Sequence, residues 1–397
     1  NQIGGAAIII PLLAQIELFQ DSTKKPLLLL TILTLIEEIL LDSSLLQSNF
    51  YSNDGFRMMG ELLSILPIDI FNNDTALKLL GIFSILTDKL LQKQMIEFVL
   101  LNMNIWVYIT TIQQFYFGHL FSTLIELIQS DKSFLSIINV KSMLYLMKCY
   151  LYTNIEESTS LDVGPKITVD GKVLAQRPND LHILREQFVA FILQIAEIQL
   201  TWEELLTILH FSFNSFDTSL QSSAIMILAR LISSQNKFIF SYLLNTQVGT
   251  SPIRNVFYHY FDLLKTSNAE LLNSLFFLFD ATSTDVLNIP RSKLNYIILT
   301  RLEPASLNIA FLEHLEKLPL KFDLKIPIFL YILTAMPETD KVPEKFKNFL
   351  ENKTIQQLFP NNQYFFYCFF ITCFLNTKFN TILETLLRDF IPICLNH

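Results

Sequence analysis

The sequence predicts an all-α fold, an armadillo- or HEAT-like α-solenoid of stacked helix pairs with one polar insertion loop. Apolar stretches of helix length follow one another from residue 8 to residue 395, and apolar side chains recur within them every three or four positions. The chain has only 9 glycines among 397 residues, fewer than a sheet-rich fold with many tight turns would need. Pairs of stretches joined by short polar turns recur about every 35 to 45 residues, the period of HEAT and armadillo arrays. No consensus repeats position by position, so the register of the repeats stays undefined.

Polar breaks place the helices of the first part of the chain. Pro26 fits the first turn of a helix, where its missing N–H needs no partner. The run from Asn72 to Thr75 supplies side-chain oxygens that can cap the helix expected at 76–91. Pro11 lies early enough in the first stretch to be absorbed in its opening turns. The expected helices are 6–19, 27–41, 56–66, 76–91, 94–110, 115–129 and 140–152.

A polar segment separates two helical parts. Residues 154–180 have few large apolar side chains and read as an exposed insertion loop between helical-repeat parts at 1–153 and 181–397, which we expect to be continuous with each other. Within the loop, Asp170 and Gly171 separate two short alternating runs, which is typical of a small β-hairpin around residues 166–174.

Helices resume after the loop, and one of them has a recognisable start. Thr201 and Glu204 form a capping box, in which the hydroxyl accepts from the backbone at Glu204 and the carboxylate reaches back to the backbone N–H of Thr201. From residue 288 onward prolines become frequent, which indicates shorter helices with tighter turns. The expected helices before that point are 181–199, 203–213, 219–233, 237–244, 251–265 and 269–279.

Composition excludes some classes of protein. The formal net charge is -8 and no basic stripe is present, which disfavours a nucleic-acid surface. The apolar stretches 26–36, 98–112 and 364–375 are shorter than the about 20 residues of a membrane span or contain polar side chains. We therefore expect no direct membrane insertion, with a membrane-embedded helical protein as the alternative. The four cysteines lie in apolar helical patterns, as reduced thiols of a cytosolic core would.

No residue pattern predicts a reaction centre, a metal site or a cofactor site. The six histidines lack the His-x-x-x-His spacing that brings two ligands to one helix face. The acidic pairs at 37–38 and 156–157 are adjacent in sequence, and adjacent helical residues point about 100 degrees apart, so neither is an acid–base couple. We therefore expect that the protein is not an enzyme and that it binds no cofactor.

Three arginines beside apolar helix faces are candidates for interaction: Arg57, Arg185 and Arg230. An arginine fork can hold the backbone carbonyls or acidic side chains of an adjoining helix. Support of the turns between repeats is the more frequent role for such residues, and both interpretations stay open.

Two short motifs near the N-terminus resemble a known family. Residues 3–15 read IGGAAIIIPLLAQ, in which Gly4 and Gly5 precede an apolar helix that carries Pro11, and residues 55–63 read GFRMMGELL. The second motif contains Gly55, Phe56 and Gly60, and Gly60 would let another helix approach closely. Both are similar to the armadillo-like region of BEACH-domain proteins, the neurobeachin and large-volume-sphere relatives. The resemblance covers about the first hundred residues.

The resemblance implies a scaffold segment upstream of pleckstrin-like and BEACH modules, which binds other proteins and neighbouring domains of the same longer chain. It implies a role in vesicle trafficking and organelle-membrane dynamics, and a cytoplasmic location, peripheral to organelle membranes through other domains. A HEAT or armadillo adaptor of another pathway, such as nuclear transport, is the alternative. The sequence names no partner or organelle and leaves the oligomeric state open.

Overall fold

The computed structural model of the protein describes five parts of the chain: residues 9–152 apart from 20 and 42, two strands within 166–175, residues 181–234 apart from 215 and 216, residues 259–265 apart from 261, and residues 268–281. The chain divides into two compact units, 1–210 and 211–397, each treated by itself below. The domain limits expected from the sequence stay predictions.

The described residues of unit 1 form mainly α-helices, and short turns join those from α1 to α9. The helices are α1 (Pro11–Leu18), α2 (Lys25–Leu40), α3 (Ser44–Ser52), α4 (Gly55–Ile65), α5 (Asn73–Ile85), α6 (Lys89–Met95), α7 (Met103–Trp106), α8 (Thr110–Ser130), α9 (Val140–Tyr150), α10 (His182–Ile198) and α11 (Trp202–Asn214), whose last residues belong to unit 2. Short 3-10 turns lie at Ser22–Lys24, Ile68–Ile70 and Lys132–Ser136, and a π-helical turn at Ile96–Leu100.

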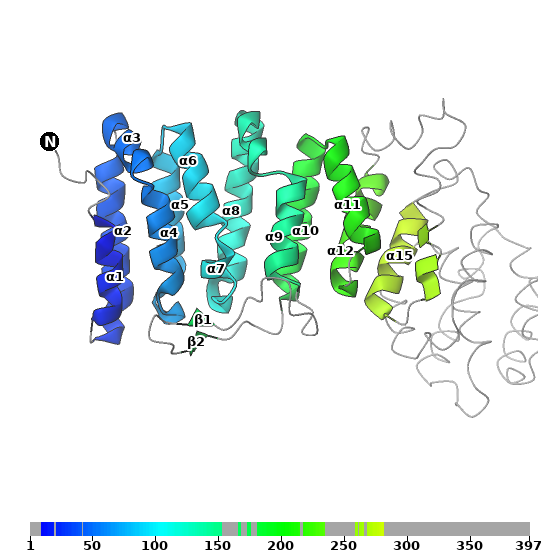
Figure 1. The fold of residues 1–397 in the computed structure, drawn as a ribbon, viewed down its shortest axis with the longest axis horizontal. Helices are drawn as coiled ribbons and strands as arrows, with labels where there is room; N and C mark the ends of the chain where they lie inside the picture. The colour runs from blue at the N-terminus through cyan, green and yellow to red at the C-terminus, as the bar shows by residue number, and fades with distance from the viewer. Residues whose placement is uncertain are drawn as a thin grey trace, which may run out of the picture. The chain divides into compact units, whose positions relative to one another are not determined.

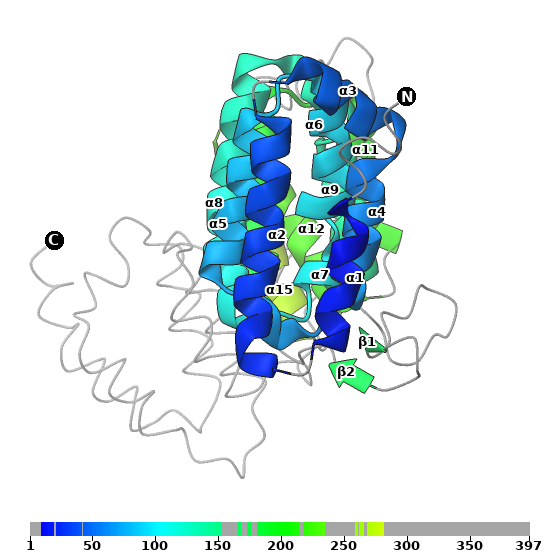
Figure 2. The ribbon, with the colours of Figure 1, turned by 90° about the vertical axis from the view of Figure 1, so that its left-hand side faces the viewer.

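The helices of unit 1 stack side by side in two layers (Figures 1 and 2). In one layer α2 packs on α5, α5 on α8 and α8 on α10. In the other, α1 packs on α4, and α4 packs on the π-helical turn and α7. The apolar side chains between the layers are buried, among them Leu33, Leu63 and Leu120, none of which has exposed surface. The fold is therefore the α-solenoid that the helical periodicity predicted.

Local signals set several helix ends as expected. Pro11 and Pro26 lie in the first turns of α1 and α2, and residues 6–8 of the first expected helix lie outside the described residues. The side chain of Asn72 accepts from the backbone N–H of Thr75 at 2.9 Å and so caps α5. The β-hairpin also forms, with β1 (Lys166–Ile167) antiparallel to β2 (Val173–Ala175).

Two expected helices are wrong and one was missed. The stretch 76–91 breaks into α5 and α6 because Asp88 caps a new helix, its carboxylate accepting from the backbone N–H of Leu90 at 2.7 Å. The stretch 94–110 breaks into the π-helical turn and α7. Asn102 caps α7, because its side-chain oxygen accepts from the backbone N–H of Asn104. The short helix α3 was not expected, since its region has no long apolar run.

Unit 2 contributes α12 (Thr218–Ser233), a 3-10 turn (Leu263–Lys265) and α15 (Ala269–Ala281). Small side chains let α12 and α15 pack closely, and the hydroxyl oxygens of Ser222 and Ser274 lie 2.6 Å apart. Asn268 donates to the hydroxyl of Thr218 at 2.8 Å, so the two helices begin beside each other. The expected helices 237–244 and most of 251–265, and everything after residue 281, lie outside the described residues.

No described helix reaches the combination of length and hydrophobicity that a bilayer span requires.

An ion pair in unit 1 generates a pH-dependent prediction. Nζ of Lys89, at the start of α6, lies 2.5 Å from Oδ2 of Asp131, which caps the turn at Lys132–Ser136. Hydrogen bonds from Lys89 and then Ser133 lower the pKa of Asp131 from 3.8 to about 2. Because the pKa is lower in the folded state, the stabilisation is complete above about pH 4 and is lost as the pH falls toward 2.

We expect Asp131→Asn, which keeps a capping oxygen but removes the charge, to lower the urea midpoint at pH 7 and to leave it unchanged at pH 2. Circular dichroism at both pH values measures the two midpoints. An equal loss at pH 7 and pH 2 would contradict the ion pair.

Candidate functional site: helix junctions and the pocket between α9 and α11

Arg185 in α10 closes the end of α9. Its Nε and Nη2 donate to the carbonyl oxygen of Leu151 at 3.1 and 2.8 Å, and Leu151 is the C-cap residue that directly follows α9. The guanidinium carbon also lies 4.4 Å from the centre of the Tyr152 ring, a cation–π distance. The guanidinium of Arg185 therefore joins α10 to α9 and holds the C-terminal end of α9.

Arg57 and Arg230 have different surroundings. Arg57 is exposed on α4, with Nε 3.5 Å from a carboxylate oxygen of Glu61 and the guanidinium 5.9 Å from the centre of the Phe98 ring. Arg230 is exposed on α12 in unit 2. The three arginines lie on three different helices, and no contact described in unit 1 joins Arg57 to Arg185. Binding of a partner by any of them stays a prediction.

The second N-terminal motif lies where α3 turns into α4. Asp54 has a φ of 52°, and α4 begins at the next residue. A Cβ on Gly55 would collide with the buried ring of Phe50, which in turn packs edge-on against Phe56 at 4.8 Å between ring centres. Gln94 of α6 accepts from the backbone N–H of Phe56 at 3.4 Å. Gly4 and Gly5 of the first motif lie outside the described residues.

Gly60 is the point where α4 meets the π-helical turn. A Cβ at this position would meet the backbone carbonyl of Phe98, so α4 can approach the turn only without a side chain there. The carbonyl of Phe98 also accepts from the side chain of Asn102 at 3.0 Å. Gly60 thus permits a backbone-to-backbone approach between two neighbouring elements.

Side chains from further along the chain satisfy the carbonyls of the same π-helical turn. The indole N–H of Trp106 donates to Val99 at 2.9 Å, and the hydroxyl of Tyr116 donates to Leu100 at 2.8 Å. The Trp106 and Tyr116 rings stack at 3.6 Å. Burial raises the pKa of the Tyr116 hydroxyl well above its ordinary value, so the group stays protonated and available as a donor.

Glu204 caps two helices at once. Its Oε2 accepts from the backbone N–H of Thr201 at 2.6 Å and from its hydroxyl at 2.7 Å, and that hydroxyl accepts from the N–H of Glu204 at 3.3 Å, which is the capping box expected for α11. Its Oε1 accepts from the N–H of Val140 at 3.0 Å, at the start of α9. Glu204 is 6% exposed, so a buried carboxyl group is held by backbone donors at the starts of two helices.

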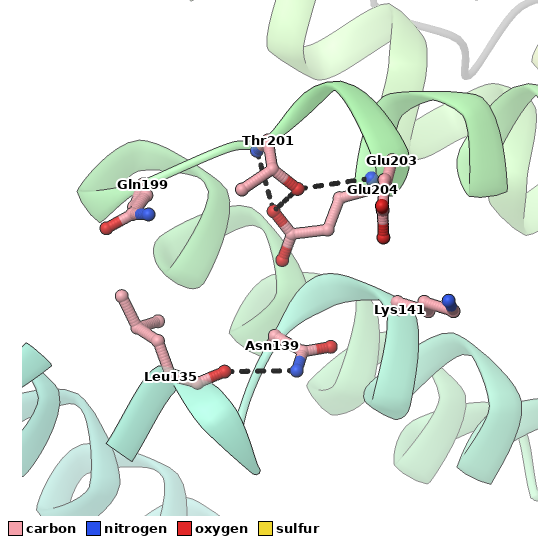
Figure 3. Close-up of a pocket in the computed structure, with 7 residues that line it drawn as sticks. All are labelled: Leu135, Asn139, Lys141, Gln199, Thr201, Glu203 and Glu204. Carbon is pink, nitrogen blue, oxygen red and sulfur yellow. Dashed lines mark hydrogen bonds between the residues drawn. The ribbon is translucent and has the colours of Figure 1, made fainter. Parts of the chain in front are cut away.

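A small pocket lies between these two helix starts (Figure 3). It has a volume of about 160 Å³ and is lined by Leu135, Asn139, Lys141, Gln199, Thr201, Glu203 and Glu204. Ligand pockets typically measure roughly 300 to 1,000 Å³. The buried carboxylate has backbone donors on both oxygens, as Figure 3 shows for Thr201, and the Asn139 amide donates to the Leu135 carbonyl at 3.0 Å. The polar groups of Asn139, Thr201 and Glu204 in this lining are therefore used to cap helix starts.

The described residues contain no group of three or more histidine, cysteine or acidic side chains that could hold a metal ion. Cys149 is a free thiol on α9, and the other cysteines lie beyond the part of the chain that the structure describes. Glu37 and Glu38 point apart on α2, and Glu37 lies 2.6 Å from Nζ of Lys78 on α5.

Sequence reasoning missed Gln47, which is fully buried on α3. Its Nε2 donates to the Leu40 carbonyl at 2.9 Å, and its Oε1 accepts from the backbone N–H of Thr87 at 2.9 Å and of Asp88 at 3.2 Å. One side chain thus joins the end of α2 to the start of α6. The only sequence signal is a glutamine at an apolar helix position, and that signal does not name its partners.

Comparison with known proteins matches residues 1–320 to a family model described as "Neurobeachin/BDCP, DUF4704 alpha solenoid region". No curated protein and no solved structure matches the chain.

The close approach at Gly60 can be tested by a substitution that adds a single methyl group. We expect Gly60→Ala to lower the free energy of unfolding by about 1–3 kcal/mol, because the added Cβ meets a backbone carbonyl that cannot rotate away. Gly118→Ala in α8 is the matched control, since its nearest atom is the Gln187 amide nitrogen at 3.9 Å. The control should gain roughly 0.5–1 kcal/mol from helix propensity. Equal effects of the two substitutions in urea denaturation would refute the contact.

The double cap is testable by removing one acceptor. In Glu204→Gln one carboxylate oxygen becomes an amide nitrogen, so either the buried N–H of Val140 or the partly buried N–H of Thr201 loses its partner. We expect a loss of about 1–3 kcal/mol in the free energy of unfolding. Glu203→Gln, at an exposed neighbouring position, should change it by less than about 0.5 kcal/mol. Similar losses for both variants would show that Glu204 does not hold the two helices.

Proposed function

Because the chain belongs to the Neurobeachin/BDCP family of α-solenoid regions, we propose that it is a non-enzymatic scaffold segment of a large BEACH-type protein. Its task is to bind other proteins in vesicle trafficking and organelle-membrane dynamics. The observation that carries this proposal is the family match over residues 1–320, together with the two layers of stacked helices in unit 1. Stacked helix pairs present long outer surfaces on which helices or loops of a partner can dock.

The use of the buried polar side chains supports a structural rather than a catalytic task. Gln47, Glu204 and Gln113 are all buried, and each is hydrogen-bonded to backbone groups at a helix end or turn. Active sites, in contrast, keep titratable groups free to exchange protons with a substrate. Such fixed polar groups hold the surface in one shape, as a scaffold requires.

The proposal places the chain in the cytoplasm, where further domains of the same polypeptide bring it to organelle membranes. The net charge of -8 suits protein partners with basic or neutral surfaces and disfavours nucleic acid.

The proposal predicts which proteins the chain captures. With the folded chain as bait in cytosol, we expect mass spectrometry to identify vesicle-coat and organelle proteins that an unrelated α-solenoid of similar charge does not retain. Recovery of transport GTPases and nuclear cargo instead would favour an adaptor of nuclear transport. Turnover of any compound in a broad panel of small substrates would contradict the non-enzymatic assignment.

A further inference from the structure

Four helices of unit 1 share an exposed side that combines aliphatic and acidic side chains. They are α2, α5, α8 and α10, each packed on the next in one layer, and Figure 2 shows α2, α5 and α8 along one side of the unit. Because α5 and α8 have layer neighbours on both sides, their exposed side chains point away from the other layer. We call the exposed side of this layer the acidic face, and its exposed residues include Leu27, Glu38, Leu77, Glu126, Ile183 and Glu197.

On α2 an aliphatic and an acidic residue share one stripe. Leu27, which is 65% exposed, and Glu38 are eleven residues apart, close to three helical turns. The residue before Glu38 is Glu37, whose carboxylate lies 2.6 Å from Nζ of Lys78 on α5. The stripe therefore adjoins the exposed side of α5, where Leu77 is 45% exposed.

The same combination recurs on α10. Ile183, which is 56% exposed, and Glu197 are fourteen residues apart, close to four turns. One turn after Ile183, the side chain of Gln187 donates to the backbone carbonyl of Gln114 on α8 at 2.9 Å, so this side of α10 adjoins α8. Aliphatic side chains that recur on neighbouring helices of one surface indicate an interaction site.

The cations of the four helices do not neutralise the glutamates of the acidic face. The helices contain only three lysine or arginine residues, and each is bonded within unit 1. Lys25 donates to a backbone carbonyl of α1, Lys78 pairs with an acid of α2, and Arg185 donates to the end of α9. Among the described residues, no hydrogen bond or ion pair reaches the carboxylates of the three glutamates named above.

The three glutamates also lie where helix stability favours a base. Glu38 and Glu197 are in the last turns of α2 and α10, and Glu126 is four residues before the end of α8. The carbonyl end of a helix carries a partial negative charge, so an acid there is unfavourable. None of the four helices has a basic residue in its last turn. Residues that break a local rule without a structural gain are expected at functional sites.

Contacts at the helix ends align the three glutamates along one edge of the layer. Gln47 donates to the carbonyls at the ends of α2 and α5 at 2.9 and 3.4 Å. Lys89, four residues beyond α5, pairs with Asp131, which directly follows α8. Leu135 and Gln199, which follow α8 and α10, line one pocket. The ends of the four helices therefore lie along one edge, and the glutamates form a row beside it.

The dimensions of this row match a helix laid across the layer. Neighbouring helix axes lie about 8–10 Å apart, so the three intervals from α2 to α10 span roughly 24–30 Å. A helix rises about 1.5 Å per residue, so roughly 16 to 20 residues cover that length. A second copy of the chain supplies no basic helix among its described residues, since none of these helices carries more than two lysine or arginine residues. The exposed lysines near the edge, Lys132 and Lys141, lie outside the four helices.

We propose that the acidic face binds a basic amphipathic helix of another protein. Lysines and arginines on one side of that helix reach the three glutamates, and its aliphatic side chains pack against Leu27, Leu77 and Ile183. Charge complementarity selects this partner, because the face repels nucleic acids and anionic membranes. The proposal rests on the scaffold function proposed above and names the chemistry of the partner.

A peptide-binding measurement on the full chain tests the proposal. The probe is a fluorescein-labelled peptide of about 18 residues that forms an amphipathic helix of lysine and leucine, and fluorescence anisotropy gives its dissociation constant. We expect Glu38→Gln, Glu126→Gln and Glu197→Gln together to raise that constant about fivefold or more. The variant should stay as stable as the parent chain in urea, because it removes acids from the carbonyl ends of helices.

The matched control combines Glu61→Gln, Glu97→Gln and Glu203→Gln, which remove three exposed charges from elements outside the layer. Its effect on the dissociation constant should be less than about twofold. Leu77→Gln should raise the constant about two- to threefold through lost apolar contact, whereas Leu90→Gln, at a 54% exposed position on α6, should leave it unchanged.

Equal effects of the two triple variants would overturn the proposal, since the peptide would then respond to net charge alone. Equally tight binding of a peptide with glutamate in place of lysine would overturn it as well. Self-association of the chain that the first triple variant abolishes would assign the face to a second copy instead, and so would also overturn it. The two proposals fail separately, because capture of no trafficking protein would refute the proposed function and leave the peptide result standing.

Discussion

The stack depends on one constraint. Where a helix ends inside the stack, its free backbone N–H or C=O groups need a hydrogen-bond partner, and a side chain from another helix supplies it. Glu204 does this for the start of α9, Arg185 for the end of α9, and Gln47 for the end of α2 and the start of α6. An unpaired buried backbone group costs about 1–3 kcal/mol. Each junction therefore fixes the position of one helix relative to the next. Burial of apolar side chains cannot do this alone, because the hydrophobic effect has no direction.

The same constraint connects the fold to the proposed task. Buried polar side chains in unit 1 are committed to helix ends, and close contacts such as that of Gly60 with the Phe98 carbonyl leave little freedom between neighbouring elements. In the scaffold role proposed above, the layers serve as a stiff support, and their outer helix surfaces are left for other proteins or other parts of the polypeptide. The family match to an α-solenoid region agrees with this arrangement.

The sequence predicted what local chemistry determines. Pro26, Asn72 and the Thr201–Glu204 box act within one turn of chain, and the structure has each helix start where they indicate. It could not predict that Glu204 also caps Val140, 64 residues away, or that Gln47 reaches residues 40 positions further on. The apolar periodicity also ran across Asp88 and Asn102, because a single capping residue interrupts a helix without interrupting the hydrophobic pattern.

Native-state hydrogen exchange of individual amides tests the central claim most directly. The amides of Thr87 and Val140 are bonded to side chains of other helices, whereas that of Thr23 is bonded to the exposed neighbouring side chain of Asp21. If long-range caps hold the stack together, Thr87 and Val140 exchange only in the large openings that expose the helix interiors, far more slowly than Thr23. Exchange of all three amides at the rate of frayed helix ends would contradict the account.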